Sequence, residues 1–290
     1  MKLRTCLSVL FLSPVFFTGC SDNEGDTVIE NPKQLKISAG IDNQQTASFQ
    51  ENDVIGVYPV SYDGNAPGIL GDISNPMNVM YTYDGKYWFP ESGNEILLNE
   101  TAVDLYAYYP YDKTMSNSID KLDLSAYPFD LSGHQQNKTK DFLWAKIENV
   151  SGINYSVGLL FTHILTRYEI NLFFDQPQVE PDIAIHNLKT ACEIDLRNGI
   201  ATPTGGNEKK VIPGRLTVND ERTIFSYEAI LPPQQVNAGT PLFSISYHTE
   251  TVVYTLPLDM DFKMQKKYVF NLIIGEAKES RKLSITEKKS

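Results

Sequence analysis

The sequence has few cysteines. Three occur in 290 residues, Cys6, Cys20 and Cys192. The first two lie in or at the edge of an N-terminal apolar segment, so the body of the chain keeps Cys192 alone and cannot form an intrachain disulfide. A lone cysteine in a folded body most often behaves as a small buried apolar residue. Nothing around Cys192 in the sequence indicates the base or helix N-terminus that a reactive thiol needs.

Recognisable catalytic and cofactor motifs are also missing. The four histidines show no pair at metal-ligand spacing, and we expect His163, which lies in a strand pattern, to be a hydrogen-bonded structural residue. No phosphate-binding loop and no Gly-x-Ser-x-Gly elbow is present. Carboxylates such as Asp120, Asp123 and Asp130 are expected in a solvated loop. We therefore predict no cofactor, no metal site and no enzymatic activity, and a hydrolase is an alternative without a supporting motif.

Positive charge is scarcer than negative charge. Lys and Arg number 25 against 36 Asp and Glu, which gives a formal net charge of −11. Removal of residues 1–19 would take away Lys2 and Arg4 and leave the mature chain more acidic. Because an acidic surface repels phosphate backbones, we expect no nucleic-acid partner.

No apolar run is long enough to span a membrane as a mature helix. The run at residues 7–17 follows two positive residues and precedes small ones, an order typical of a cleaved signal peptide. The four residues from Phe17 to Cys20 resemble a bacterial lipobox, which predicts cleavage between Gly19 and Cys20 and a lipid on Cys20. An ordinary secretory signal with an incidental cysteine is the alternative. We assign residues 1–19 to the signal peptide and residues 20–33 to a lipidated flexible tether.

The body of the chain is rich in aromatic residues and in period-two alternation. Its 16 Tyr and 14 Phe favour half-buried strands. Asp84-Gly85 between aromatic runs predicts a hairpin with a type I′ turn. Residues 160–174 predict one half-buried strand, or two joined by a bend, with Leu160 on the apolar face and His163 on the other. Further strands are expected at residues 54–58, 103–109, 142–147, 225–231, 243–247, 252–258 and 268–274.

Short strands separated by Gly-, Pro-, Asn- and Asp-rich loops indicate β-sandwiches. The length suffices for two ordinary domains. We therefore predict an all-β chain. Its expected parts are an N-terminal β-sandwich at residues 34–158, a C-terminal β-sandwich at 159–276, and a charged tail at 277–290 with Leu283 and Ile285 as its apolar positions.

Six segments in order carry a resemblance to a known family. They are residues 53–58, 104–111, 141–145, 160–167, 230–234 and 268–272. Behind the lipobox, they resemble the Bacteroidetes fimbrillin family of Mfa-like and FimA-like fimbrial subunits. The resemblance implies two transthyretin-like β-sandwich domains in tandem and a place in fimbriae on the outer membrane.

The resemblance also implies a mode of assembly. In such fimbriae a protease removes the first strand of an exported lipoprotein, and a strand of another subunit fills the groove by β-strand addition. In this chain the candidate exchangeable strand surrounds Leu35 and Ile37, whose side chains should point into the core. Residues 20–51 contain no arginine, so Lys33 and Lys36 are the candidate processing sites. A subunit that keeps its lipid would act as a membrane anchor.

We therefore expect a structural or adhesive subunit or anchor of a fimbrium, exposed at the outer membrane as a lipoprotein. Its expected partners are other fimbrial subunits, with a host or bacterial surface molecule as a further candidate. Anchor, shaft and tip positions stay open. The alternative is a surface glycan-binding lipoprotein of a polysaccharide-uptake system, which needs an exposed aromatic platform, although such residues usually pack within sheets. The candidate platform residues are Tyr106, Tyr108 and Tyr111, or Tyr81, Tyr83, Tyr87 and Trp88.

Overall fold

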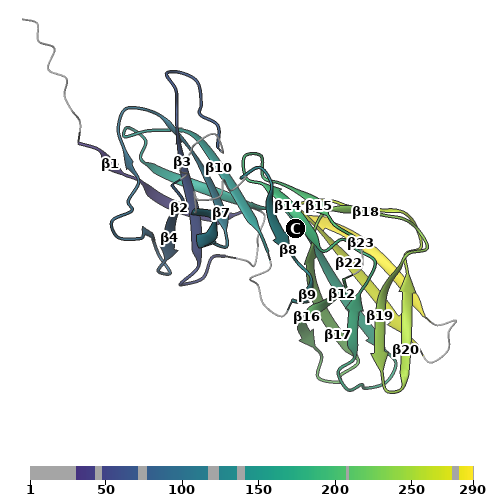
Figure 1. Cartoon of the computed structure of the whole chain (residues 1–290). Helices are drawn as coiled ribbons and strands as arrows, with labels where there is room; N and C mark the ends of the chain where they lie inside the picture. The colour runs from purple at the N-terminus through teal and green to yellow at the C-terminus, as the bar shows by residue number, and fades with distance from the viewer. Residues whose placement is uncertain are drawn as a thin grey trace, which may run out of the picture. The chain divides into compact units, whose positions relative to one another are not determined.

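The computed structural model describes residues 31–42, 48–70, 77–116, 124–135, 141–206, 209–275 and 281–289. Strands make up its regular structure, apart from one short 3₁₀-helix, η1 (Lys113–Ser116) (Figure 1). None of these residues forms a helix long and apolar enough to cross a membrane. The predicted signal peptide, with Gly19 and the lipidation site Cys20, lies outside the described residues. So do Asp120 and Asp123.

A seven-stranded sheet dominates the N-terminal part of the fold. Its order is β2 (Lys36–Ile41), β11 (Ser156–His163), β10 (Leu143–Val150), β7 (Val103–Tyr109), β3 (Val54–Ser61), β4 (Val79–Tyr83) and β5 (Trp88–Pro90). A two-stranded sheet joins β1 (Lys33–Gln34) to β6 (Leu97–Leu98). The alternation seen in the sequence places one residue in two, such as Val57, Leu105 and Ala145, in a hydrophobic core on one face of the large sheet, here called the smaller core.

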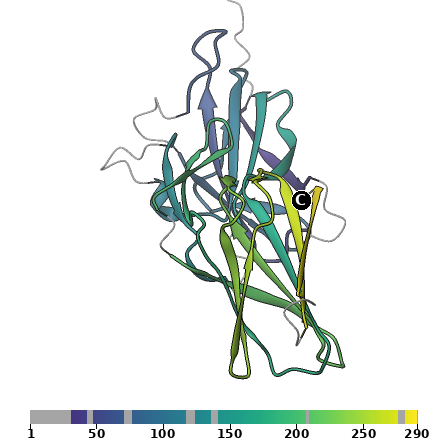
Figure 2. The ribbon, with the colours of Figure 1, turned by 90° about the vertical axis from the view of Figure 1, so that its right-hand side faces the viewer.

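The C-terminal part is a nine-stranded sheet. Its path is β20 (Glu250–Thr255), β19 (Pro241–Tyr247), β13 (Asp182–Ile185), β16 (Val211–Val218), β17 (Ile224–Leu231), β12 (Thr166–Phe174), β22 (Lys266–Ile274) and β23 (Lys282–Lys289), with β9 (Gly133–Gln135) paired to β16 (Figure 2). Two small sheets accompany it: β15 (Ile200–Thr204), β14 (Ala191–Asp195) and β8 (Tyr127–Asp130), and β18 (Gln234–Val236) with β21 (Met260–Phe262). The all-β fold with two β-sandwiches in tandem is confirmed.

The larger hydrophobic core spans both parts of the chain. It contains Tyr58, Tyr108 and Phe142, from the N-terminal half, together with Tyr168 and Phe270 of the nine-stranded sheet. Cys192 belongs to this core and is almost fully buried, as predicted, and burial raises the pKa of its thiol to about 12.

A polar group with a perturbed pKa lies beside this core. Tyr127 donates its hydroxyl to Asp112 Oδ2 at 2.6 Å, and the backbone N–H and hydroxyl of Thr114 donate to Asp112 Oδ1. Burial acts to raise the pKa of Asp112, but these hydrogen bonds outweigh it and hold the pKa below the usual value of a carboxyl group.

Two strands from the N-terminal half of the chain pair with strands of the C-terminal half. β8 and β9 lie in the predicted N-terminal range, yet β8 pairs with β14 and β9 pairs in parallel with β16. Trp144 of β10 also donates its indole N–H to the carbonyl of Leu196 at 2.7 Å. The predicted boundary at 158/159 falls inside β11, so it does not coincide with the division between the sheets.

Residues 160–174 form two strands in different sheets rather than one continuous strand. β11 buries Leu159, Phe161 and His163 and leaves Leu160 60% exposed, whereas β12 buries the set that begins at Thr166. The prediction that Leu160 shares the buried face is therefore wrong. The link at residues 164–165 resets the alternation, because each strand faces its own core.

One further prediction needs correction. The hairpin between β4 and β5 exists, but its turn spans residues 84–87 and Gly85 has a positive φ of 93° while Asp84 does not, so it is not type I′. Asp84 instead accepts the N–H groups of Lys86 and Tyr87. The charged tail contains β23, which pairs antiparallel with β22 (Figure 2). Its two apolar positions, Leu283 and Ile285, pack against the larger core.

Candidate functional site

The candidate site is the N-terminal segment at residues 33–41, which forms the short strand β1 and then β2, together with the strands that pair with it. β1 pairs with β6, and the N–H of Leu35 donates to the carbonyl of Ile96 at 2.9 Å. β2 then runs parallel to β11 over six residue pairs, from Lys36 opposite Ser156 to Ile41 opposite Phe161. Hydrogen bonds at both ends of β2 complete the ladder.

The side chains of this segment alternate as predicted. Leu35 is 2% exposed and Ile37 is 8% exposed, and both belong to the smaller core. Ala39 and Ile41 are partly buried and pack against the same core. Full burial of a large aliphatic side chain contributes about 1.5–3 kcal/mol, so Leu35 and Ile37 are the principal apolar anchors of the strand.

β2 forms backbone strand pairing along one edge alone. It lies at the end of the seven-stranded sheet, where β11 is its neighbour in the described fold. The pairing is parallel, which is slightly less stable for each residue than antiparallel pairing. By contrast, β10 lies between β11 and β7 and is paired along both edges. β2 can therefore leave without breaking any other strand pair of its sheet.

Two glycines lie on the outer face of this strand pair. A Cβ added at Gly40 would meet no atom within 4 Å, and one added at Gly158 would lie 3.6 Å from Ser38 Oγ, an ordinary contact. Neither residue has a positive φ. Neither a steric nor a backbone requirement explains these glycines, and glycine within a strand is less stable than alanine by about 0.5–1 kcal/mol.

The candidate processing residues lie within the same segment. Lys33 is exposed at the start of β1, and Lys36 is exposed at the start of β2, where its ammonium lies 5.6 Å from the centroid of the Tyr155 ring. A cut after Lys33 would leave both anchors on the retained chain. A cut after Lys36 would remove Leu35 and keep Ile37.

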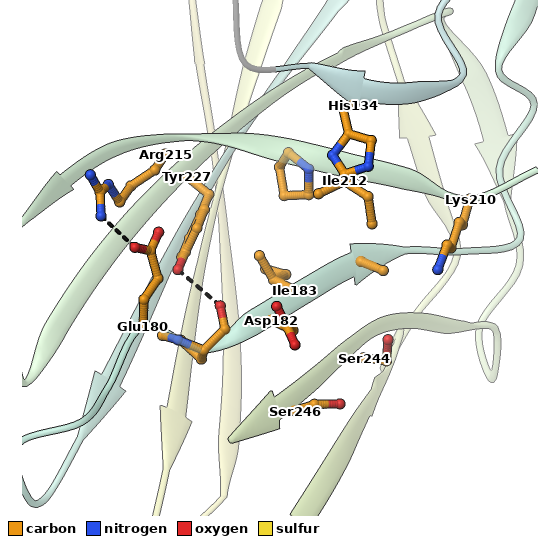
Figure 3. Close-up of a pocket in the computed structure, with 13 residues that line it drawn as sticks. His134, Glu180, Asp182, Ile183, Lys210, Ile212, Arg215, Tyr227, Ser244 and Ser246 are labelled. Carbon is orange, nitrogen blue, oxygen red and sulfur yellow. Dashed lines mark hydrogen bonds and ion pairs between the residues drawn. The ribbon is translucent and has the colours of Figure 1, made fainter. Parts of the chain in front are cut away.

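An opening between two interior strands of the nine-stranded sheet contrasts with β2. β13 and β16 are paired at Ile185 and Val211 alone, and beyond that pair they separate around a hollow of about 500 Å³. The hollow is lined by side chains of both charge signs, such as Asp182 and Lys210 (Figure 3). The described residues contain no group of three or more His, Cys, Asp and Glu side chains placed to hold a metal ion.

The exposed edges at this hollow are protected against strand addition. Pro181 borders β13 and Pro213 lies within β16, and proline has no N–H to donate to an added strand. An ion pair between Glu180 and Arg215 crosses the hollow, and the Tyr227 hydroxyl donates to the carbonyl of Pro181 (Figure 3). Proline and charge are common protections of edge strands, so this edge is a poor acceptor.

The proposed aromatic platforms are mostly buried. Tyr81 and Tyr108 are fully buried, and Tyr106 and Trp88 are nearly so. Tyr87, at 54%, is the largely exposed member of the two candidate sets. The packing expectation is confirmed for the buried members, and no continuous platform results from these seven residues.

Polar side chains near the link between β11 and β12 form a hydrogen bond and ion pairs. His163 Nδ1 lies 2.6 Å from Asp141 Oδ2, and both side chains are largely buried. Arg167 approaches Asp141 at 3.8 Å and Glu228 at 3.4 Å. The prediction of a hydrogen-bonded structural histidine is confirmed, and sequence reasoning missed the Asp141 partner, which lies 22 residues away in the chain.

Comparison with known protein sequences gives a consistent picture. A family model described as fimbrillin-like matches residues 40–287. A Bacteroides ovatus protein provisionally named as the fimbrium tip subunit Fim1C is 25% identical over 200 residues. The match covers 59% of this chain but 36% of that relative, so the chain spans well under half of the relative's length.

Two crystal structures share the fold. A provisionally assigned cell adhesion protein from Bacteroides ovatus superimposes with a TM-score of 0.71 at 18% identity, and one from Bacteroides uniformis with a TM-score of 0.63 at 21% identity. Each superposition covers 89% of this chain and 98% of the other. At these identities the likeness establishes the two-sandwich fold.

Proposed function

The chain belongs to the fimbrillin-like family, and we propose that it is a cell-surface fimbrial subunit whose strand β2 is replaced by a strand of a neighbouring subunit. The observation that carries the proposal is the position of β2. It is an edge strand, paired in parallel with β11, and fixed by two deeply buried side chains, Leu35 and Ile37. Removal of such a strand leaves a groove with a free backbone ladder, which is the requirement for β-strand addition.

The proposal includes how the chain reaches and leaves the membrane. Cleavage between Gly19 and Cys20 would leave a lipidated Cys20 that holds the chain at the outer membrane. Cleavage after Lys33 or Lys36 would release the chain from its lipid but leave Ile37 and the rest of β2 on the chain, so an incoming strand would then have to displace β2. The exposure of both lysine side chains supports this route. N-terminal sequencing of the mature protein tests it. Lipidated Cys20 indicates an anchor or precursor, a start at residue 34 or 37 indicates processing, and any other N-terminus contradicts the route.

A disulfide lock tests strand replacement itself. Ser38 and Gly158 are register partners, and a Cβ at Gly158 would lie 3.6 Å from Ser38 Oγ, so side chains at these two positions are in contact. The double variant Ser38→Cys, Gly158→Cys should fix β2 in place. We expect surface material from bacteria carrying this variant to lose the detergent-resistant complexes that contain the chain, and to recover them when a reductant is present during assembly.

A matched lock at another edge provides the control. Asn271 and Ser284 are register partners between β22 and β23, with side chains 3.5 Å apart. The variant Asn271→Cys, Ser284→Cys should form its disulfide and still enter complexes. Undiminished complexes from the β2 lock, with its disulfide verified by mass spectrometry, would overturn the proposal.

A further inference from the structure

The inward side chains of β2 define which strand the groove can accept. Together with Leu35, which directly precedes β2, they occupy four alternate positions, Leu35, Ile37, Ala39 and Ile41. The outward residues Lys36, Ser38 and Gly40 are exposed or partly exposed, so they set few limits on a replacement strand. The inward positions therefore carry the selectivity, as alternate side chains do in strand addition generally.

The register with β11 specifies what surrounds each position. Ile37 lies beside Val157, Ala39 beside Leu159 and Ile41 beside Phe161. All three β11 side chains are buried in the smaller core, and Phe161 is fully buried against the ring of Phe49. A charged group placed beside them would lose hydration without gaining a partner, which is strongly unfavourable.

β23 offers an internal comparison because it begins with the same spacing of apolar residues. Its alternate positions are Leu283, Ile285, Glu287 and Lys289, so the first two match Leu35 and Ile37 in type and spacing. The third and fourth are charged. The other face of β23 carries lysine, serine and threonine. Reversing the direction of β23 or shifting its register would therefore place at most two apolar side chains at the inward positions.

β23 also has favourable contacts where it lies. Glu287 forms an ion pair with Lys266 at 2.9 Å and accepts the hydroxyl of Tyr268 at 3.2 Å. Leu283 and Ile285 pack against the larger core. Transfer of β23 to the groove of a second copy would break these contacts and bring Glu287 and Lys289 beside Leu159 and Phe161.

We infer that the groove takes a strand from a different subunit and rejects β23 of a second copy. The accepted strand has four alternate inward positions, with large apolar side chains at the first, second and fourth and a small one at the third. This inference rests on the proposed function. It assigns the selectivity to the third and fourth positions, where β2 carries Ala39 and Ile41.

Peptide exchange into the intact chain tests the inference. A specific endopeptidase site is inserted between residues 42 and 48, the folded protein is cut there, and native mass spectrometry verifies that β2 stays bound after the cut. Three fluorescent peptides are then added: residues 32–42, residues 281–289, and residues 281–289 with Glu287→Ala and Lys289→Ile. The third peptide keeps the outward residues of β23 but carries apolar side chains at all four inward positions, as in the β2 segment.

We expect the first and third peptides to displace β2, measured by anisotropy and by native mass spectrometry, and the second to bind at least about tenfold more weakly. A control peptide, residues 281–289 with the outward change Thr286→Ser, should bind as weakly as the second. If the unmodified β23 peptide binds as tightly as the β2 peptide, the inference is wrong while the proposed function stands. If neither the β2 peptide nor the converted peptide enters the groove, the proposed function fails and the inference with it.

Discussion

Truncation of Leu35 to alanine should loosen β2 before it loosens the rest of the fold. Leu35 is 2% exposed and belongs to the smaller core, and its strand lies at the edge of the sheet. A buried Leu→Ala change costs about 2–5 kcal/mol. Because β2 can separate without breaking other strand pairs, most of that cost should fall on local opening, which corresponds to a decrease in protection of about 25-fold to 4,000-fold.

Hydrogen–deuterium exchange read by mass spectrometry is the assay. The amides of β2 should lose protection in Leu35→Ala, while amides of β7 and β10 should change far less. Leu97→Ala is the matched control, because Leu97 of β6 pairs with Gln34 of β1 but its side chain is 62% exposed. Its effect should stay within about 0.5 kcal/mol. An equal loss of protection across all strands of the seven-stranded sheet in Leu35→Ala would refute the reasoning, since β2 would then open only with its sheet.

Three further outcomes follow from side chains described above. Gly40→Val should slow displacement of β2 by about twofold to fivefold in the peptide assay, because it removes the strand penalty of glycine in open space; Ser284→Thr on β23 should leave the rate unchanged. Ellman's reagent at pH 8 should label Cys192 at least about a hundredfold more slowly in the folded protein than in denaturant, because burial keeps the thiol neutral; rapid native labelling would contradict this. Asp112→Asn should lower the free energy of unfolding at pH 7 by about 1.5–3 kcal/mol. Because the pKa of Asp112 is lowered by folding, its stabilising contribution is present above the pKa of the unfolded chain, about 3.9, and is lost as pH falls through the pKa of the folded protein. The melting temperatures of variant and wild type should therefore converge in acid.

The strands were predictable because period-two alternation is a local signal. The anchors Leu35 and Ile37 follow from it, since alternate residues of a half-buried strand face the core. The pattern also supports the family resemblance, whose six segments lie mostly within the strands. Burial of Cys192 follows from residue type alone.

The misplacement of Leu160 has a plain physical cause, which is that alternation does not record the sheet to which a strand belongs. Leu160 is misplaced because β11 and β12 serve different cores, and a change of one residue in phase moves every side chain to the other face. The tail has a weak apolar pattern, with Leu283 and Ile285 as its apolar positions. The sequence does not show that β22 is the strand with which it pairs. The protected edge at Pro181 and Pro213 requires two strands from distant parts of the chain and leaves no local signature.

The exchange of β8 and β9 into the C-terminal sheets limits how such a gene can be shuffled. A chimera joined at residue 158 would take β8 and β9 from one parent and their partners β14 and β16 from the other. It would also divide between the parents the two hydrogen bonds that the Gln135 side chain makes with the backbone of Ile230. A graft that carries residues 124–135 with the C-terminal half keeps those pairs intact. A recombined chain of this fold should therefore keep each strand with its partner strands, even where this moves the junction away from the middle of the sequence.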